Sequence, residues 1–274
     1  MKALLAAVLT AALVAGCQSS GSSTTAESAQ PIAKARAALA PGRNTCRAQR
    51  LAASAGLAGR TLAVSRPSDI VLEDREVVLT FDDGPIPRKT MSILDTLDDY
   101  GAKATFFMVG RMARSYPKLV RAVAARGHSI GSHTQNHPDL TRLSRKSAMA
   151  EVAQGERAIA AALAGSGQSA APFFRFPYLA ESKALRAAMA KRGVAVIGVD
   201  IDSNDYHRVT PARVKAYTMK RLRAKGRGII LFHDIHARTA TMLPSSLAAL
   251  KAEGYKVVHL VPPGTPVPCP TLSF

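Results

Sequence analysis

Two adjacent carboxylates mark the first place in the sequence where the residue types could do chemistry. Asp82 and Asp83 follow a run of strand-forming residues, 77–81, and are followed at once by Gly84 and Pro85, so the chain must turn there. Two carboxylates held close together repel each other and tend not to share one role. The same residues also fit an ordinary tight turn, because Asp-Gly and Gly-Pro pairs are common in turns. The rest of the chain has to decide between these interpretations.

A pair of histidines offers a second kind of chemistry. His133 and His137 are four residues apart, so one helical turn between them would bring both imidazoles to the same side, where they could bind one metal ion. Taken alone, such a pair is more often two ordinary surface or packed histidines. A carboxylate from the end of the 77–81 run would complete a His, His, Asp set. Three protein ligands leave coordination positions for water, as in a hydrolytic metal site.

The elements that must position these residues follow a repeating pattern. Short apolar runs predict strands at 77–81, 104–109, 128–133, 172–176, 194–199, 228–233 and 256–260. The helical stretches between them end at glycines, which favour the left-handed conformation of a helix C-terminus: Gly101, Gly127, Gly165, Gly193, Gly226 and Gly254. This alternation predicts parallel βα units closed into a barrel. An open dinucleotide-binding sheet is disfavoured, because no glycine-rich phosphate loop follows the first of these strands.

Polar side chains cluster where the expected strands end. In a barrel of parallel strands the chemistry belongs at the carboxyl ends of the strands. Five clusters follow five of these strands: Asp82 with Asp83, His133 with His137, Arg175 with Tyr178, the segment DIDSNDY at 200–206, and His233. We therefore expect the five clusters to converge on one mouth.

These clusters resemble a known family. The segments TFDDGP, HTQNH, RFPY, DSNDY and LFH resemble, in order over residues 77–260, the five motifs of the NodB-type polysaccharide deacetylases, carbohydrate esterase family 4. The resemblance implies an α/β fold, a distorted (β/α)7 barrel, and metal-dependent removal of acetyl groups from N-acetylated sugars. It also implies that Asp83, His133 and His137 bind the metal, while Asp82 is the catalytic base. Zinc is the expected ion, with cobalt, manganese and iron as alternatives.

Further catalytic roles follow from the same resemblance. Arg175 matches the arginine that pairs with the catalytic base, which would hold Asp82 ionised and oriented. His233 matches the general acid that protonates the sugar amine. Asp205 would raise the pKa of His233 through its nearby charge, so that a proton stays available near neutral pH.

Three residues are expected to contact substrate. Tyr178 matches the residue whose backbone N–H helps to bind the oxyanion, and Leu231 fits the apolar wall around the acetyl methyl group. Tyr206 stands where the family commonly has Trp, and Leu179 stands where it often has glycine; the chain has no Trp. Because sugar rings usually stack on aromatic faces, these departures predict a different substrate preference or a shallow cleft.

The first 45 residues differ from the rest. Lys2 precedes an apolar run, 3–15, that is too short for a membrane span and predicts a secretory signal. Residues 13–17, LVAGC, resemble a bacterial lipoprotein signal, which implies a lipid on Cys17; a plain secretory signal with a chance cysteine is the alternative. Residues 18–45 are rich in Ser, Thr, Ala and Gln and predict a flexible linker. The expected organisation is a signal peptide at 1–17, this linker, and a deacetylase domain at 46–274.

Export determines how the other two cysteines are interpreted. Cys46 and Cys269 remain as an even pair in an oxidising compartment, and we expect them to be bridged; two separate thiols are the alternative. The expected location is the bacterial cell envelope, with the lipid on the periplasmic face of a membrane, or else the periplasm or the exterior. A monomer is expected.

The chain is strongly basic, with a net charge of +18. Residues 1–45 hold four Lys or Arg and one Glu, so most of this charge belongs to the domain. Such a charge attracts polyanions. Export and the lack of an RNA- or DNA-binding motif argue against nucleic acid, which leaves an anionic envelope glycan or a membrane surface; a merely solvated basic face is the alternative.

The predicted function is hydrolysis of the N-acetyl group of a glycan that contains N-acetylglucosamine, either peptidoglycan or a related envelope polysaccharide. Two alternatives remain open. One is an acetyl-ester or cyclic-imide hydrolase of the same fold, because the same water-activating site could hydrolyse those bonds. The other is a glycan-binding lipoprotein without turnover, although a binding protein needs no paired base and acid.

Overall fold

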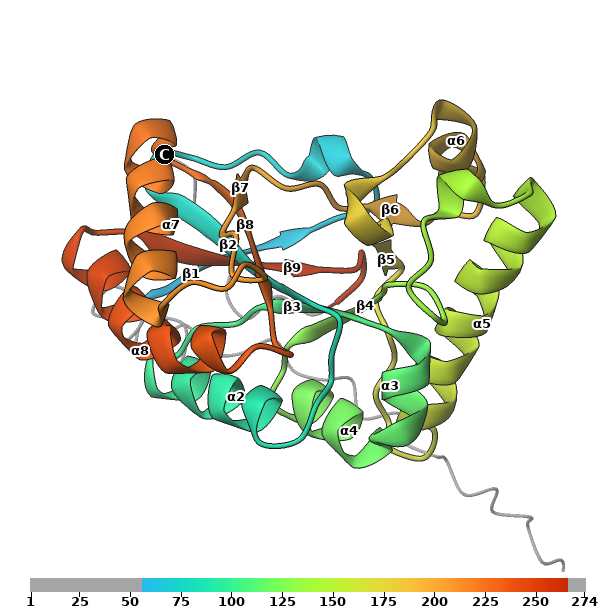
Figure 1. Ribbon diagram of the computed structural model, residues 1–274, viewed down its shortest axis with the longest axis horizontal. Helices are drawn as coiled ribbons and strands as arrows, with labels where there is room; N and C mark the ends of the chain where they lie inside the picture. The colour runs from blue at the N-terminus through green and yellow to red at the C-terminus, as the bar shows by residue number, and fades with distance from the viewer. Residues whose placement is uncertain (1–55, 266–274) are drawn as a thin grey trace, which may run out of the picture. The chain divides into compact units, whose positions relative to one another are not determined.

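Parallel strands form one sheet in the computed structural model, which describes residues 56–265 (Figure 1). The strands are β1 (Ala58–Ala63), β2 (Glu76–Asp82), β3 (Thr105–Met108), β4 (Ser129–Ser132), β5 (Phe173–Phe174), β6 (Ala195–Val196), β7 (Ile201–Asp202), β8 (Gly228–His233) and β9 (Lys256–Val261). Their order in the sheet is β1-β9-β2-β3-β4-β5-β6, and β8 pairs with both β2 and β7.

Helices connect most of these strands and cover the sheet. They are α2 (Lys89–Asp99), α3 (Gly110–Ser115), α4 (Pro117–Ala125), α5 (Arg145–Leu163), α6 (Lys183–Lys191), α7 (Pro211–Lys225) and α8 (Ala237–Ala252). Short 3-10 helices lie at Pro67–Asp69, Leu140–Arg142 and Pro177–Leu179. Within residues 56–265, no helix combines the length and the apolar character needed to cross a bilayer.

The strands curve into an incomplete barrel around β2. Residues 80–82 of β2 pair with β3, and residues 77–82 pair with β8 on the other side. The ladder continues from β3 through β4 and β5 to β6, and from β8 to β7. Among the described residues no ladder joins β6 to β7, so the barrel is open between them. This parallel α/β architecture confirms the predicted fold class, including its distortion.

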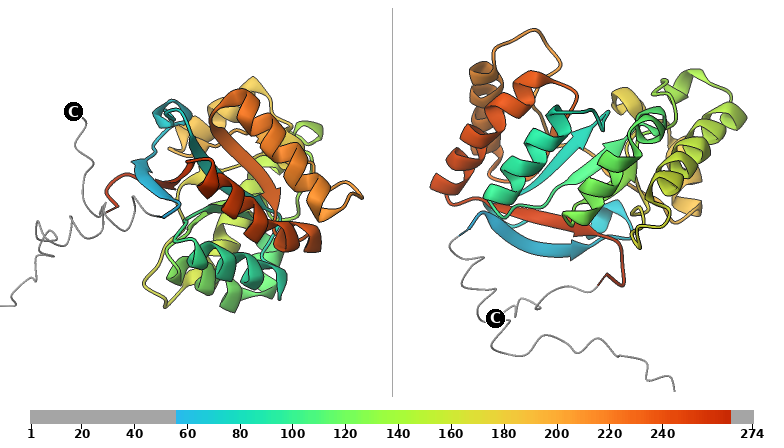
Figure 2. Two further views of the ribbon diagram at one scale, coloured as in Figure 1. Left: turned by 90° about the vertical axis from the view of Figure 1, so that its left-hand side faces the viewer. Right: turned by 90° about the horizontal axis from the view of Figure 1, so that it is seen from below.

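All seven predicted strands are present, together with two that were not predicted. β1 pairs with β9, which also pairs with the start of β2; Figure 2 shows β1 and β9 side by side. β7 follows β6 without an intervening helix and pairs with β8. β7 has only two residues and so shows no periodicity, and the alternation of apolar and polar residues in β1 is weak. Both strands therefore depend on pairing with strands that are distant in the sequence.

The pleat of β2 divides its side chains between two cores. Leu79 and Phe81 pack in the core beneath the helices, whereas Val78 belongs to a second cluster. Because successive side chains of a strand point to opposite faces, Thr80 and Asp82 share the inner face with Val78. The alternation that builds the core therefore also points Asp82 into the barrel.

The predicted helix ends are confirmed. Helices α2, α4, α5, α6, α7 and α8 each stop one or two residues before a glycine with positive φ: Gly101, Gly127, Gly165, Gly193, Gly226 and Gly254. These glycines occupy the left-handed conformation that ends a helix without steric cost. The predicted signal peptide and linker, and the three cysteines Cys17, Cys46 and Cys269, lie outside the described residues.

Candidate active site

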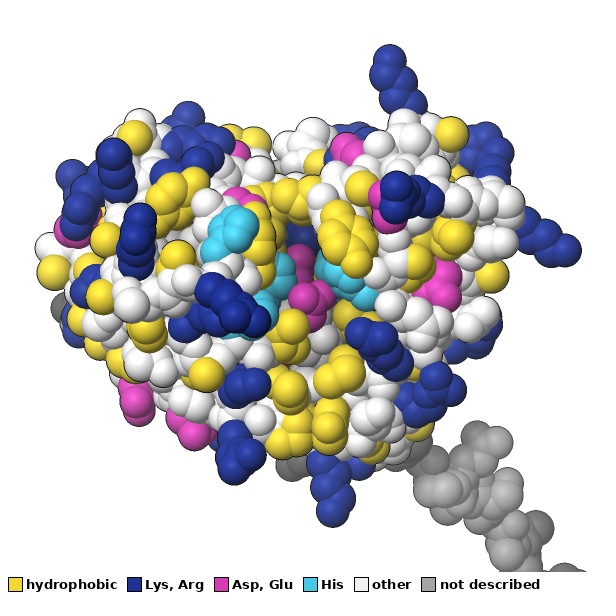
Figure 3. Space-filling model, viewed as in Figure 1, with side chains coloured by type: hydrophobic (Ala, Val, Ile, Leu, Met, Phe, Trp, Pro, Cys, Tyr) yellow, Lys and Arg dark blue, Asp and Glu magenta, His cyan; other side chains and the backbone are white. Residues whose placement is uncertain are grey.

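The carboxyl ends of the strands meet at a hollow lined by histidine and carboxylate side chains (Figure 3). β2 leads into Asp82 and Asp83, β4 into His133, β5 into Arg175 and β8 into His233. The predicted convergence of these strand ends on one mouth is therefore observed.

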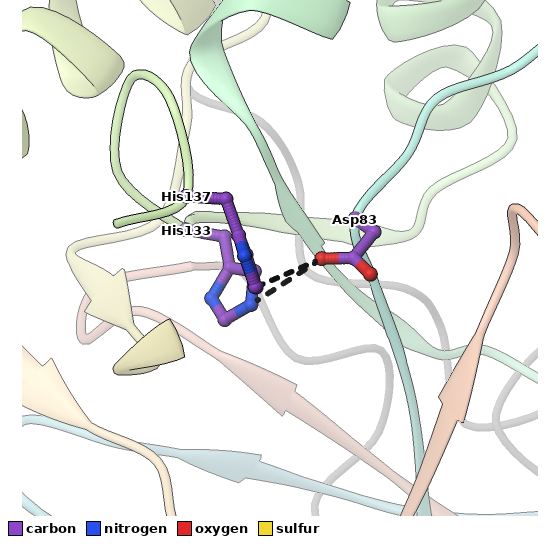
Figure 4. Close-up of side chains that lie close together, drawn as sticks. All are labelled: Asp83, His133 and His137. Atoms are coloured by element: carbon purple, nitrogen blue, oxygen red, sulfur yellow. Dashed lines mark ion pairs between the residues drawn. The ribbon is translucent and has the colours of Figure 1, made fainter. Parts of the chain in front are cut away.

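Asp83, His133 and His137 form a group that could hold a metal ion (Figure 4). Oδ1 of Asp83 lies 3.6 Å from Nε2 of His133 and 3.2 Å from Nε2 of His137. Ligand atoms of a tetrahedral metal with bonds of about 2.0–2.1 Å lie about 3.4 Å apart. Asp83 Oδ1 is also buried and accepts no hydrogen bond within the described chain. A buried, unpaired oxygen facing two ring nitrogens fits a divalent cation.

His133 and His137 come together without the helical turn that their spacing would allow. The two residues lie in a non-helical loop in which Thr134 and His137 have φ of 67° and 62°. Oγ1 of Thr134 accepts a hydrogen bond from the backbone N–H of His137 at 2.9 Å, which closes the loop. The two imidazole centroids are 4.8 Å apart, so the side chains still meet. A spacing of four residues fits both conformations, and only the fold selects one.

A backbone carbonyl group orients the ring of His133. Its Nδ1 lies 2.8 Å from the carbonyl oxygen of Arg175, so Nδ1 carries the proton and donates it. Nε2 then presents its lone pair towards Asp83. Burial lowers the pKa of His133 to about 3, which keeps the ring neutral, as a metal ligand must be.

Asp82 is held by a buried arginine. Its Oδ1 accepts a hydrogen bond from Nη1 of Arg175 at 2.8 Å. Arg175 also donates to Oγ1 of Thr80 at 2.7 Å and to the carbonyls of Ile197 and Gly198 at 3.2 and 2.9 Å. Asp82 and Arg175 are 2% and 1% exposed. Burial raises the pKa of the Asp82 carboxyl, and the charge of Arg175 opposes that rise.

The two adjacent acids face the same centre with different partners. Oδ2 of Asp82 does not contact Arg175 and lies 3.8 Å from Nε2 of His133. Asp83 faces the two histidines instead. A tight turn alone requires neither arrangement, so the geometry favours the chemical interpretation of this pair.

His233 is paired with a fully buried carboxylate. Its Nδ1 lies 2.7 Å from Oδ1 of Asp205, and its backbone N–H donates to Oδ2 of Asp205 at 2.8 Å. Oγ1 of Thr239 donates to the same Oδ2 at 2.5 Å. Burial by itself lowers the pKa of His233, but the hydrogen bond and charge of Asp205 raise it to about 9. His233 is therefore protonated at neutral pH, with its second ring nitrogen free of Asp205.

The strand that positions Asp205 was predicted incompletely. The sequence predicts a strand at 194–199, whereas the structure has β6 at Ala195–Val196 and then β7 at Ile201–Asp202. Asp202 pairs with Leu231 in the register of β7 against β8. It is β7, next to the strand that carries His233, that brings Asp205 within reach of the imidazole.

Comparison with known proteins agrees with this geometry. The family model described as polysaccharide deacetylase matches residues 70–197. A chitooligosaccharide deacetylase of Bradyrhizobium sp. (strain ANU 289) is 35% identical over 172 residues, which cover 63% of this chain and 76% of that protein. The chain belongs to the polysaccharide deacetylase family. The predicted family and enzyme class are thereby confirmed.

Two further relatives are longer proteins. The peptidoglycan-N-acetylglucosamine deacetylase of Listeria monocytogenes serotype 1/2a (strain 10403S) is 33% identical over 68% of this chain, which spans 38% of that protein. The solved structure of a Bdellovibrio bacteriovorus peptidoglycan deacetylase superposes with a TM-score of 0.66 at 36% identity, over 77% of this chain and 57% of that one.

Two exposed tyrosines border the deacetylase mouth. Tyr178 is 69% exposed, and its ring centroid lies 4.6 Å from that of His137. Tyr206 is 45% exposed, and its ring centroid lies 5.6 Å from that of His233. Leu231 is 4% exposed and lies opposite Thr80 in the β2–β8 register, two residues before His233. The tyrosines are therefore open to a ligand, whereas Leu231 is buried among the strands.

Leu179, which stands where the family often has glycine, adopts a backbone conformation that favours glycine. Tyr178 and Leu179 have φ of 59° and 55°, in the left-handed region that favours glycine. A non-glycine residue there costs about 1–2 kcal/mol. The glycine that the family often has after this motif suits that backbone, and this chain keeps the conformation without it.

Sequence reasoning missed Asp234. This carboxylate is 1% exposed, and its Oδ2 accepts a hydrogen bond from Oγ1 of Thr90 at 2.6 Å. A Cβ atom on Gly84 would lie 2.1 Å from the same oxygen, so the backbone after Asp83 packs directly on Asp234. Burial, together with the charges of Asp83 and Asp82, raises the pKa of Asp234 to about 7. An acid immediately after His233, at the end of an apolar strand, was the available signal.

Proposed function

We propose that this polysaccharide deacetylase hydrolyses the N-acetyl group of N-acetylglucosamine units in an envelope glycan, with peptidoglycan as the first candidate. One observation carries the proposal: a carboxylate held by Arg175 and a protonated imidazole held by Asp205 lie beside the group formed by Asp83, His133 and His137. Its bacterial relatives, a chitooligosaccharide deacetylase and a peptidoglycan-N-acetylglucosamine deacetylase, support this choice of substrate.

The reaction makes three demands. An acetamide is a poor electrophile with a poor leaving group, so hydrolysis needs an activated water, a stabilised oxyanion and a proton for the departing amine. A divalent cation held by Asp83, His133 and His137, with zinc as the expected ion, would supply Lewis-acid polarisation of the carbonyl and lower the pKa of a water molecule.

The chain's own groups meet the remaining demands. Oδ2 of Asp82, the oxygen not bound to Arg175, accepts the proton of the attacking water. Arg175 keeps the carboxylate ionised and fixes its direction through the bond to Oδ1. His233 donates the proton of its free ring nitrogen to the amine as the carbon–nitrogen bond breaks.

Substrate contacts complete the proposal. The backbone N–H of Tyr178 assists at the oxyanion, and the exposed rings of Tyr178 and Tyr206 contact sugar faces from the two sides of the mouth. Leu231 would form the floor beneath the acetyl methyl group. We also propose that the enzyme works outside the cytoplasm as a monomer, anchored through a lipid on Cys17, with Cys46 and Cys269 bridged.

Acetate release tests the proposed activity. The full-length chain is assayed on N-acetylglucosamine hexamer and on purified peptidoglycan, after chelation and again after zinc is restored. Release that stops on chelation and returns with zinc is expected. Asp82→Asn should keep its bound zinc and lose roughly 10²–10⁴-fold in kcat. Asp200→Asn, which changes a half-buried carboxylate at the opposite end of β8, is the matched control.

Other outcomes would redirect the assignment. Release that is insensitive to chelation would contradict the role of the metal ligands, and unchanged release in Asp82→Asn would contradict the role of Asp82 as the base. If zinc is bound but neither glycan releases acetate, O-acetylated sugars and cyclic imides are the next substrates. Binding of glycan with no turnover on any of these would indicate a binding protein.

A further inference from the structure

Lysine and arginine side chains surround the hollow of the active site (Figure 3). Several exposed cations lie at this end, in loops or first helical turns that follow the carboxyl ends of strands, and six of them are Arg88, Arg111, Arg145, Lys146, Arg208 and Arg213. We call these six the mouth cations. In the part of the chain that the structure describes, none of the six forms an ion pair.

The positions of these cations are unfavourable for the helices that carry them. A helix N-terminus has a positive partial charge and prefers Asp or Glu in its first turn. Arg111 lies in the first turn of α3, Arg145 and Lys146 in that of α5, and Arg213 in that of α7. None of the six helices that begin at the mouth has an acidic residue in its first turn. Helix stability therefore does not explain this distribution of charge.

The need to neutralise acids in the active site does not explain the positions of the mouth cations either. Asp82 is paired with Arg175, and Asp205 is paired with His233. Asp83 faces the two histidines of the candidate metal site. These three carboxylates thus have partners of their own, and none of them forms an ion pair with a mouth cation.

We infer that the mouth cations bind carboxylate groups carried by the glycan on either side of the sugar that is deacetylated. The enzyme then favours a carboxylate-bearing strand over a neutral strand of the same length. The exposed tyrosines that border the mouth suit uncharged ring faces, and the unpaired mouth cations suit anionic substituents. This inference rests on the proposed function and names the class of its substrate.

An anionic bilayer would also attract these cations, but it fits the structure less well. The cations lie on the face that contains the hollow, so a membrane bound there would cover the entrance to the active site. A polymer strand can cross the same face and present one sugar to the centre. The glycan is therefore the occupant that the arrangement favours.

Paired substitutions test the inference. The double variants Arg145→Gln with Lys146→Gln, and Arg88→Gln with Arg111→Gln, each remove two mouth cations. The matched control is Lys191→Gln with Lys251→Gln, two exposed lysines in the last turns of α6 and α8. KM for acetate release is measured on purified peptidoglycan and on neutral N-acetylglucosamine hexamer, at low and at near-physiological salt.

Each mouth variant should raise KM on peptidoglycan about tenfold at low salt, and the effect should shrink as salt screens the charges. KM on the hexamer should change by less than about twofold, and the control should match wild type on both substrates. Since the substitutions remove cations from helix N-termini, Tm should be unchanged or higher, which separates lost binding from misfolding.

Two results would overturn the inference. The first is an equal rise in KM on peptidoglycan and on the hexamer, and the second is an unchanged KM on both. If KM is unchanged but the mouth variants lose binding to phosphatidylglycerol vesicles, the face would be assigned to a membrane.

A second measurement keeps this inference separate from the proposed function. Binding of the Asp82→Asn chain to insoluble peptidoglycan is followed by co-sedimentation, with and without the mouth substitutions. If no glycan releases acetate but the mouth substitutions abolish co-sedimentation, the proposed function fails and the binding surface stands. If acetate is released but co-sedimentation is unaffected by the substitutions, the binding surface fails.

Discussion

The two ends of the barrel differ in how their acids and cations are paired. At the end opposite the mouth, several cations pair with acids near the surface, such as Arg126 with Asp95 and Arg223 with Glu253, each at 2.6 Å, while the control lysines Lys191 and Lys251 form no ion pair within residues 56–265. At the mouth, the six mouth cations have no such partners in the described chain although Glu181 pairs with Arg186, and the acids Asp82 and Asp205 are buried. A cation that is paired with an acid attracts a further ligand less strongly, whereas the unpaired mouth cations lie beside the active site and remain available to a ligand there.

Burial adds a second difference between the two ends. The pairs at the opposite end are solvated, and exposed ion pairs contribute only about 0–1 kcal/mol to stability. The pairs Asp82–Arg175 and His233–Asp205 are shielded from water and tied into hydrogen-bond networks. Removing one partner there leaves an uncompensated buried charge. A change at the mouth should therefore cost far more than a similar change at the opposite end.

Arg175→Met should have the largest effect on stability. It leaves the buried Asp82 carboxylate without its cation and should lower the free energy of unfolding by about 3–5 kcal/mol. Arg223→Met, which breaks an exposed pair, is the matched control and should cost less than about 1 kcal/mol. Urea unfolding measures both. Equal costs would show that burial does not distinguish the two ends.

Asp205→Asn should alter the pH dependence of the reaction. As the proposed general acid, His233 must be protonated, so kcat/KM should be present below the pKa of His233 and lost above it. That pKa is raised to about 9 chiefly by Asp205, against burial, which lowers it. Without the Asp205 charge the alkaline limb should move from near pH 9 to lower pH, measured as kcat/KM between pH 6 and 10.

Asp200→Asn is the control for this pH profile. Asp200 pairs with Lys225 at the opposite end, 2.5 Å away, and its substitution should leave the alkaline limb in place. An unmoved limb in Asp205→Asn would show that His233 is not the group that titrates.

Gly84→Ala should test the packing beneath Asp83, the proposed metal ligand. The new Cβ would lie 2.1 Å from Oδ2 of Asp234, so the turn after Asp83 must shift. We expect a loss of about 1–3 kcal/mol in stability, as for overpacking of a core, and weaker zinc binding. Gly198→Ala is the control, because a Cβ there meets no atom within 4 Å. Unchanged zinc affinity in Gly84→Ala would show that this contact does not position Asp83.

Arg126→Gln should have the smallest effect. It removes the exposed contacts with Asp95 and Asp98 at the opposite end, at 2.6 and 3.1 Å. The expected cost is less than about 1 kcal/mol in urea unfolding, with no change in acetate release. A larger cost would mean that these exposed pairs act as a network, and the contrast between the two ends would weaken.

Parts of the site could be predicted because their cause is local. The order of polar clusters after apolar runs placed Asp82, Asp83, His133, Arg175 and His233 at strand ends, and the parallel barrel brought those ends together. The conformation of the loop between His133 and His137 could not be predicted, because it depends on Thr134 and on a positive φ that residue spacing does not reveal. Asp234 was missed because its role depends on Gly84, which lies far earlier in the chain.

The sequence by itself determined which residues end the strands, on which face of β2 Asp82 lies, and where the helices stop. These features depend on periods of two and 3.6 residues and on the conformational freedom of glycine, and both act over a few residues. Only the tertiary structure decided that Arg175 reaches Asp82 across 93 positions and that Asp205 reaches His233 across 28. Such contacts depend on which strands are neighbours in the sheet, and that order results from packing of the whole domain.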